Sequence, residues 1–282
     1  MSMQPLKGIK VVTIAFNLPG PAAVSQLDRW GATVIKVEPP GGDPMARHTP
    51  DFYRYLLGNQ VVVALDLKQD AARQQLDGYL AAADVLVTSS LPSSLARLGL
   101  GWTRLHEEFP KLCQVAIVGH APPEQDRPGH DLTYQATVGL LTPPAMPLTL
   151  LADMAGAQTA VSHTLGVLLE RSRTGAGAMS FVPIADAVDF FTLPLRYELT
   201  LPGGRLGGGF PFYNLYPTAE GWLAVAALEP QFWAQLKTLL NLQEPTYEAM
   251  KAVFLTQSAE HWQAWAQANR LPMAAVRTLQ TS

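Results

Sequence analysis

Residues 8–38, GIKVVTIAFNLPGPAAVSQLDRWGATVIKVE, decide the fold of this chain. The stretch begins with an apolar, β-branched run, GIKVVTIAF, and ends with a second one, ATVIKVE. Between them, a turn containing proline and glycine leads into a segment with helical spacing, whose apolar positions include Ala22, Leu27 and Trp30. Continuously apolar strands separated by helices are typical of a parallel sheet that is covered on both faces. The stretch therefore predicts the first strand–helix–strand unit of such a sheet.

The same alternation continues outward from this unit. Further strands are predicted at residues 61–67, 84–89, 111–119 and 179–186. Helices are predicted at 72–83 and over 151–171, the longest helical period, which basic residues and glycines close. This pattern indicates an α/β fold with a Rossmann-like, doubly wound parallel sheet.

Composition changes near residue 200. Residues 201–213 are rich in glycine, proline and aromatic side chains, which marks a linker or domain boundary. Beyond them, a strand is predicted at 221–228 and helices at 230–242 and 259–270. We therefore expect a Rossmann-like large domain over 1–200, a linker over 201–213 and a smaller α+β domain over 214–282.

The overall composition excludes several classes of protein. With 282 residues, 48% of them hydrophobic and 15% charged, the chain has ample material for a core. A formal net charge of −3 gives no basic field for nucleic acid. The single cysteine, Cys113, excludes an internal disulfide and a cysteine-based zinc site, and we expect no metal. No signal peptide and no apolar stretch of about 18 residues are present, so we expect a cytoplasmic protein without a membrane partner.

A dinucleotide site is the first functional hypothesis that such a sheet raises. Glu38 ends the second predicted strand, as a ribose-binding acid would. The first turn, NLPGPAAV, lacks the G-x-G-x-x-G spacing that lets the backbone approach a pyrophosphate. NAD binding is therefore not predicted.

A histidine and an aspartate stand side by side in RPGHDLTYQATVGLL, residues 127–141, where a helix is expected to begin. Asp131 suits an N-cap that bonds the free N–H groups of the first turn, and this role is at least as well supported as a chemical one. His130 lies at the positive end of the helix dipole, which favours the neutral imidazole that can act as a base near pH 7. A loop histidine whose hydrogen bonds are satisfied is an equal alternative for His130.

Two further acids stand at expected helix starts. Asp153 opens the 151–171 helix, where an ionised N-cap is the usual role of an aspartate, although the same place suits a carboxylate base or nucleophile. Glu229 follows an apolar strand in ALEPQFW and equally suits a capping or first-turn acid of the next helix. The presence of His130 and Glu229 as possible partners favours the second role for Asp153, that of a base or nucleophile.

Short motifs that resemble one known family run nearly from end to end of the chain. They are PLKGIKVV, LPGPAA, GATVIKVEPPGGDP, ALDLK, ADVL followed by RLGLGW, GHDLTYQATVGLL, ADMAG, RSRTGAG and LAVAALEPQFW. In this order they resemble the family III CoA-transferases (CaiB/BaiF type), which include the α-methylacyl-CoA racemases. The resemblance implies a large Rossmann-like domain, a smaller α+β domain and a dimer of two interlocked rings. It also implies that this chain is short at its C-terminus, since relatives continue beyond MAAVRTLQ.

The resemblance assigns roles to the candidate residues. Asp153 takes the place of the acid that is the nucleophile of the transferases and one of the two acid/base groups of the racemases. The G-H-D form resembles the racemase branch, in which the residue equivalent to His130 is the second acid/base group. Glu229 matches a glutamate that supports this histidine. The expected substrate is an acyl-CoA or a small carboxylic acid, with coenzyme A as the implied cofactor.

The segments that hold CoA in the family depart from its pattern. Gln60 and Val61 replace a basic pair, Ser89 and Leu91 replace an asparagine and an arginine, and the acidic VGHAPPEQDR replaces a glycine-rich turn. Losing cations there removes charge-assisted hydrogen bonds, so weakened CoA binding is expected. Nearby cations that could compensate by reaching the phosphates are Arg29, Lys36, Arg47 and Arg97.

Three functional hypotheses follow from the sequence. The first is a racemase that uses His130 and Asp153 on a 2-methylacyl-CoA. The second is a CoA-transferase in which Asp153 forms an acyl anhydride and then a CoA thioester. The third is a non-catalytic or repurposed relative. A homodimer is expected under all three, because the apolar helix from residue 154 onward needs covering.

Overall fold

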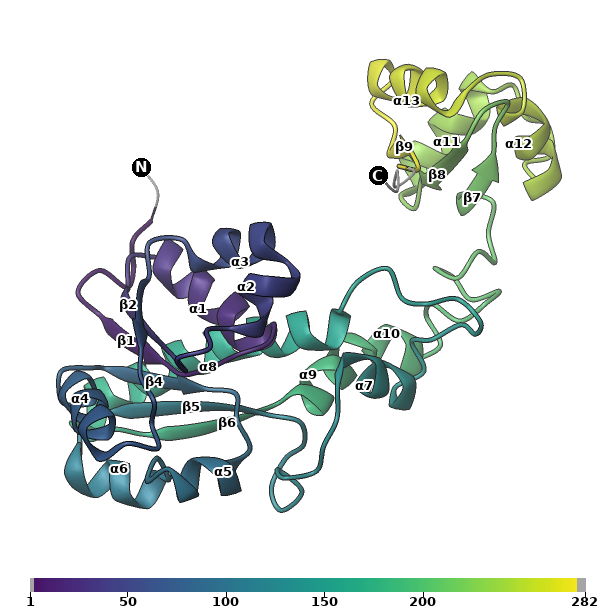
Figure 1. Ribbon diagram of the computed structural model, residues 1–282. Coiled ribbons are helices and arrows are strands. Elements are labelled where there is room, and N and C mark those ends of the chain that lie inside the picture. The colour runs from purple at the N-terminus through teal and green to yellow at the C-terminus, as the bar shows by residue number, and fades with distance from the viewer. Residues whose placement is uncertain (1–2, 278–282) are drawn as a thin grey trace. The chain divides into compact units, whose positions relative to one another are not determined.

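The computed structural model describes residues 3–277, which divide into two compact units at Thr192–Leu193. The first unit contains a six-stranded sheet and the second a three-stranded sheet (Figure 1). Among the residues described, no helix has the length and apolar character needed to cross a membrane. Each unit has its own buried core, so each is described by itself.

The six-stranded sheet is parallel throughout, with the strand order β3-β2-β1-β4-β5-β6. Its strands are β1 (Lys10–Thr13), β2 (Thr33–Glu38), β3 (Val61–Ala64), β4 (Val85–Thr88), β5 (Cys113–Val118) and β6 (Met179–Pro183). In register, Val11 of β1 pairs with Val34 of β2 and Val85 of β4. This order is that of a doubly wound sheet, with the order reversing between β1 and β4. The parallel α/β sheet predicted from the sequence is confirmed.

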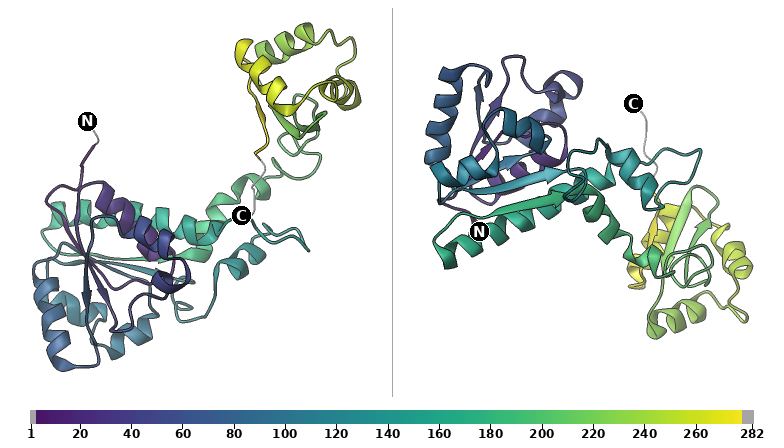
Figure 2. Two further views of the ribbon diagram at one scale, coloured as in Figure 1. Left: turned by 45° about the horizontal axis from the view of Figure 1, so that its top comes forward. Right: turned by 90° about the horizontal axis from the view of Figure 1, so that it is seen from below.

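Helices cover both faces of this sheet (Figure 2, left). They are α1 (Pro19–Arg29), α2 (Pro44–His48), α3 (Pro50–Leu57), α4 (Asp70–Ala81), α5 (Pro92–Arg97), α6 (Trp102–Glu108), α7 (Asp131–Thr137), α8 (Leu151–Thr174) and α9 (Ile184–Phe191). Successive strand residues point to opposite faces. Accordingly Val11 joins the core formed with α1, α8 and α9, whereas Val12 joins the core formed with α4, α5 and α6.

Small residues let α8 lie close to its neighbours. Its buried face carries Ala155, Gly156 and Ala160, and the helix packs mainly on α1 and α9. A Cβ on Gly156 would lie 3.0 Å from the side chain of Ile184 on α9, so glycine allows this approach. The helix ends at Gly175 in the left-handed conformation (φ 77°), as the closing glycines predict.

The turn after β1 brings α1 back to the sheet. Pro19 occupies the first position of α1, where a missing N–H costs nothing. Gly20 lies so close to Ala15 that a side chain at this position would collide with it. The LPGPAA motif therefore lets α1 begin in close contact with the chain at the carboxyl end of β1.

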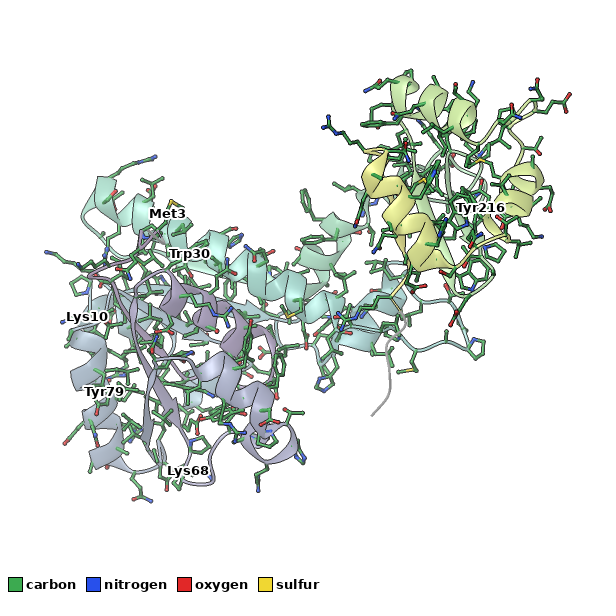
Figure 3. The ribbon with its side chains drawn as sticks, turned by 90° about the horizontal axis from the view of Figure 1, so that it is seen from above. Met3, Lys10, Trp30, Lys68, Tyr79 and Tyr216 are labelled. Carbon is green, nitrogen blue, oxygen red and sulfur yellow. The ribbon has the colours of Figure 1, made fainter. Side chains whose placement is uncertain are left out.

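The second unit is a small α+β structure. It contains α10 (Leu193–Arg196), β7 (Tyr213–Pro217), β8 (Trp222–Ala226), α11 (Pro230–Leu239), α12 (Tyr247–Phe254), α13 (Ala259–Ala268) and β9 (Met273–Ala275). Its strands form an antiparallel sheet in the order β7-β8-β9. Tyr216, labelled in Figure 3, is fully buried among Tyr247, Phe254 and Met250. The predicted α+β unit is confirmed.

Candidate functional site

A cavity of about 450 Å³ lies at the carboxyl ends of the sheet strands in the first unit. Its walls come from the segments that follow β1, β4 and β5 and from α7 and α8. The strand order reverses between β1 and β4, and open α/β sheets bind ligands at such a switch point. The sheet topology thus places the cavity where a ligand site is expected.

His130 and Asp153 both line this cavity. His130 is the N-cap residue of α7, and its backbone N–H donates to Thr133 Oγ1 at 3.0 Å. Its imidazole is exposed. The fold therefore brings together two predicted groups that are 23 residues apart in sequence.

Asp153 does not cap its helix as predicted. The N-cap of α8 is Leu150, and Asp153 is the third residue of the first turn, with its side chain half-buried. Burial, followed by the nearby charge of Asp131, raises the pKa of its carboxyl group from 3.8 to about 6, and His130 opposes the change. A carboxyl group with this pKa can change protonation state near neutral pH, as acid/base catalysis requires.

Asp131 is not the N-cap of α7, because His130 holds that position. The Asp131 side chain is 4% exposed, and its Oδ1 accepts a hydrogen bond from the backbone N–H of Asp153 at 3.0 Å. The predicted capping role is therefore wrong for α7. The carboxylate caps α8 instead, a partner that local sequence does not reveal.

Tyr134 is a cavity residue that the sequence analysis missed. Its ring is buried on α7, one turn after His130, and its hydroxyl fits between Gly119 and Gly129. A Cβ on Gly129 would lie 2.5 Å from this hydroxyl, so the glycine makes room for it. Burial, followed by the charge of Asp153, raises the pKa of the phenol above its usual value. The group stays protonated and can donate a hydrogen bond.

Glu229 belongs to the second unit. It is the exposed N-cap residue of α11, and its side chain makes no capping hydrogen bond. This matches the capping position that the sequence left open as an alternative. Its predicted support of His130 stays a prediction.

Four cations were predicted to bind the phosphates of CoA. None of them is among the described residues that line the cavity. Arg29 lies over the ring of Tyr55 at 4.4 Å, and Arg47 is exposed. Arg97 is also exposed and donates to Ser94 Oγ, on the cavity rim, at 2.9 Å.

Lys36 is held inside the fold. Its ammonium group lies 2.9 Å from Glu38 and 2.6 Å from Asp43, and the side chain is 3% exposed. Tyr53 donates to the same Glu38 at 2.8 Å. This arrangement joins β2, the following loop and α3, and it does not favour the predicted phosphate contact.

The segments that depart from the family pattern have internal partners. Ser89 Oγ lies 3.0 Å from the Phe16 nitrogen and 3.1 Å from its oxygen, and Gln60 donates to the Leu56 carbonyl at 2.8 Å. Asp126, from the acidic turn, accepts two hydrogen bonds from Ser93 at the start of α5. The loop before α7 is thus tied to α5 beside the cavity.

A second cavity of about 200 Å³ adjoins the first, because both are lined by Phe16 and Ser90. Its walls are mostly apolar, from Ile14, Val37, Pro39, Leu65, Leu95 and Leu98. Two cations were missed by the sequence analysis. Lys68 lines this cavity and Arg127 lines the first one.

Within residues 3–277, no group of three or more His, Cys, Asp or Glu side chains is arranged to hold a metal ion.

A family model described as "CoA-transferase family III" matches residues 6–282. Human α-methylacyl-CoA racemase is 33% identical over 258 residues, which cover 84% of this chain and 65% of that protein. A probable fatty acyl-CoA transferase of Mycobacterium tuberculosis, Rv3272, is 30% identical over 272 residues, covering 84% and 69%. Mouse succinyl-CoA:glutarate CoA-transferase is 28% identical over 267 residues, covering 86% and 61%. The chain thus spans about two thirds of the length of these relatives.

Solved structures show the same fold. The crystal structure of Rv3272 from M. tuberculosis superposes with a TM-score of 0.82 at 26% identity, covering 98% of this chain and 84% of that one. A CAIB/BAIF family protein from Brucella suis gives a TM-score of 0.80 at 23% identity, covering 98% and 85%.

Proposed function

Because the chain belongs to CoA-transferase family III, we propose that it racemises or epimerises a 2-methylacyl-CoA with His130 and Asp153 as its acid/base pair. The observation that carries this proposal is that both side chains line one cavity, with the pKa of Asp153 raised to about 6. The human and mouse proteins among its relatives that are named α-methylacyl-CoA racemase support the same activity.

The proposed reaction moves one proton off the α-carbon and returns one to its other face. One group of the pair must be a base when the other is an acid, and an imidazole beside a carboxyl group whose pKa is raised to about 6 meets this need. The enolate formed between the two steps carries negative charge on the thioester oxygen. Donors facing the cavity, such as the Tyr134 hydroxyl, stabilise such charge.

The two adjoining cavities offer a place for acyl-CoA. The larger one, with the reactive pair, would take the acyl group and thioester, and the apolar smaller one would take part of the CoA moiety. The proposal includes CoA binding that is weaker than in typical relatives. Loss of two or three charge-assisted contacts at roughly 1.5–3 kcal/mol each lowers affinity by orders of magnitude unless other cations compensate.

Calorimetric titration with CoA measures this affinity. Arg29, Arg47 and Arg97 are tested by substitution with alanine, together with Arg127 and Lys68. Micromolar or tighter binding that none of these substitutions weakens would contradict this map of the site.

Interconversion of the two epimers of a 2-methylacyl-CoA tests the racemase proposal, with exchange of the α-proton in D₂O followed beside it. His130→Ala and Asp153→Asn should each abolish interconversion, because moving the proton from one face of the α-carbon to the other needs both groups. Each variant can still exchange the proton on the face of its remaining base. Matched controls are His48→Ala and Asp186→Asn, which remove an exposed histidine and an exposed acid away from the cavity. Interconversion at the wild-type rate in either active-site variant argues against the proposal.

A second candidate is CoA transfer between carboxylic acids. It is favoured by the position of Asp153 at the cavity wall, where a carboxylate nucleophile can reach a bound substrate. Six of its curated relatives are named as transferases. In that reaction Asp153→Asn abolishes transfer, whereas His130→Ala leaves much of it. Wild-type protein that neither exchanges the proton nor transfers CoA supports the repurposed alternative.

A further inference from the structure

The carboxylate of Asp131 joins the start of α7 to the start of α8. One oxygen accepts the backbone N–H of Asp153 at 3.0 Å, and the other accepts the Gln135 side-chain amide at 2.6 Å. The same amide donates to the Thr149 carbonyl, just before α8, at 3.2 Å. Asp131 and Gln135 are 4% and 3% exposed, so this junction lies inside the fold.

The junction supplies what α8 lacks in its own sequence. The first N–H groups of a helix need acceptors, and the N-cap residue usually provides one from its side chain. The N-cap residue of α8 is Leu150, whose side chain has no acceptor. An acid 22 residues earlier in the chain therefore takes this role, on the residue that faces the cavity.

Asp131 also brings a charge close to the candidate reactive acid. Neither Asp131 nor Asp153 forms an ion pair within residues 3–277. The titratable groups that face Asp153 are Asp131, His130 and Tyr134 from α7, with Arg127 from the preceding loop on the same cavity. The elements α1, β5 and α9 face the cavity with apolar side chains, those of Pro19, Ile117, Val118 and Ile184.

We propose that Asp131 is a positioning residue, which fixes the Asp153 backbone at the cavity wall and places a like charge beside its side chain, while Gln135 holds Asp131. The inference deepens the proposed function, because it explains how a reactive Asp153 is placed and tuned. Two like charges in one partly buried site disfavour the ionised form of each other. The second largest cause of the raised pKa of Asp153 is this charge, after burial.

A carboxyl-carbon NMR titration of the full chain with ¹³C-labelled aspartate tests the effect of the charge. The Asp153 signal is identified by its loss in Asp153→Asn. In Asp131→Asn the Asp153 midpoint should move to lower pH, because the like charge is gone while burial remains. In the control Asp186→Asn, which removes an exposed acid at the start of α9, the midpoint should stay in place. An unchanged midpoint in Asp131→Asn overturns the electrostatic part.

Amide hydrogen exchange tests the positioning part. Loss of the cap in Asp131→Ala should speed exchange of the Asp153 amide about ten-fold, the usual effect of losing a helix cap. Gln135→Leu keeps the charge of Asp131 but removes its donor, so it should speed exchange several-fold and leave the Asp153 midpoint raised. Exchange at the wild-type rate in both variants overturns the positioning role.

The wild-type protein provides a test if a variant does not fold. The amide proton of Asp153 should be protected from hydrogen exchange in the wild-type protein, since it donates to the Asp131 carboxylate. An Asp153 amide that exchanges as fast as an unprotected one contradicts the inference. None of these measurements uses a substrate. A chain without racemase or transferase activity can still pass them, and an active chain can fail them, so the two proposals fail separately.

Discussion

At the scale of single residues, the carboxyl group of Asp153 is both a candidate reactive group and a cost to folding. It is partly removed from water, and it lies beside a second acid with no cation paired to either in the described chain. A pKa shifted in this way is common at sites where a group must change its protonation state. The same arrangement therefore predicts effects on stability and on activity.

The stability effect follows from the raised pKa. The folded state holds the Asp153 proton up to a pH of about 6, whereas the unfolded chain releases it near 3.8. The free energy of unfolding therefore falls as the pH rises from about 3.8 to about 6. Above this range the folded protein carries the full cost of the ionised carboxyl group. We expect Asp153→Asn to raise the free energy of unfolding at pH 7.5 by on the order of 1 kcal/mol, after allowance for solvent screening.

Urea unfolding at pH 4 and at pH 7.5 measures this effect. The gain should shrink at pH 4, where the wild-type carboxyl group is protonated in the folded protein. An equal or larger gain at the acid pH would contradict the assigned pKa of Asp153.

The Tyr134 hydroxyl is expected to affect the reaction more than folding. In Tyr134→Phe the ring keeps its packing while the donor that faces the cavity is lost. Turnover should fall about 100-fold, as when one oxyanion donor is removed, with CoA affinity unchanged. The matched control is Tyr79→Phe on α4, labelled in Figure 3, whose hydroxyl contacts Gln75 away from the cavity. Wild-type turnover of the Tyr134 variant would show that this hydroxyl has no role in the reaction.

Sequence reasoning predicted His130 and Asp153 as a pair but misplaced the acid between them. Asp131 has the residue type and place of a local cap, and only the three-dimensional path of residues 138–150 brings α8 to it. Tyr134 was within reach of the sequence analysis, since it follows His130 by one helical turn. Its free hydroxyl depends on Gly119 and Gly129, whose approach no sequence spacing shows.

At the scale of elements, the buried charges around β2 fix the loop that follows it. Lys36, Glu38 and Asp43 form a compact group that is almost fully removed from water. Asp43 also caps α2 by accepting the Met45 N–H at 2.9 Å. Glu38, the acid at the end of β2 that raised the hypothesis of a ribose site, instead bonds Lys36 and Tyr53 within the protein.

Lys36→Met tests this structural role. Removing one partner of a buried ion pair leaves uncompensated carboxylates, so we expect a loss of about 3–5 kcal/mol in the free energy of unfolding. The matched control is Lys68→Met, which removes an exposed lysine at the second cavity and should spare stability while weakening CoA binding. Urea titration and calorimetry separate the two effects. A stable Lys36 variant with weakened CoA binding would restore the phosphate contact predicted from the sequence.

Long apolar elements were predictable, and short polar ones were not. All six strands of the large sheet and the long helix α8 follow from continuous apolar runs or helical periods. The short helices α2, α3, α5 and α6 were missed, because five to eight residues carry too little periodicity to separate a helix from a loop. Prolines begin α2, α3 and α5, and Asp126 from the loop before α7 also bonds the start of α5.

At the scale of the whole molecule, the exposed apolar side chains of α8 predict self-association. Met154, Leu165 and Leu169 are 43%, 39% and 62% exposed, although the helix also carries a buried face. We expect a homodimer at micromolar concentration, measured by sedimentation velocity. Leu169→Glu should shift the equilibrium toward monomer. A monomeric wild-type protein would contradict the prediction.

The path of the chain between β5 and β6 has a consequence for how such proteins diversify. His130, Tyr134 and Asp153 all lie in this single crossover, whereas the two strands that it joins are neighbours in the sheet. The crossover can therefore be exchanged as one cassette without altering the pairing of any strand. Transplanting residues 119–178 between relatives of different activity should move the choice of reaction with them. Hybrids that exchange only parts of this segment would show how few positions separate one reaction from another.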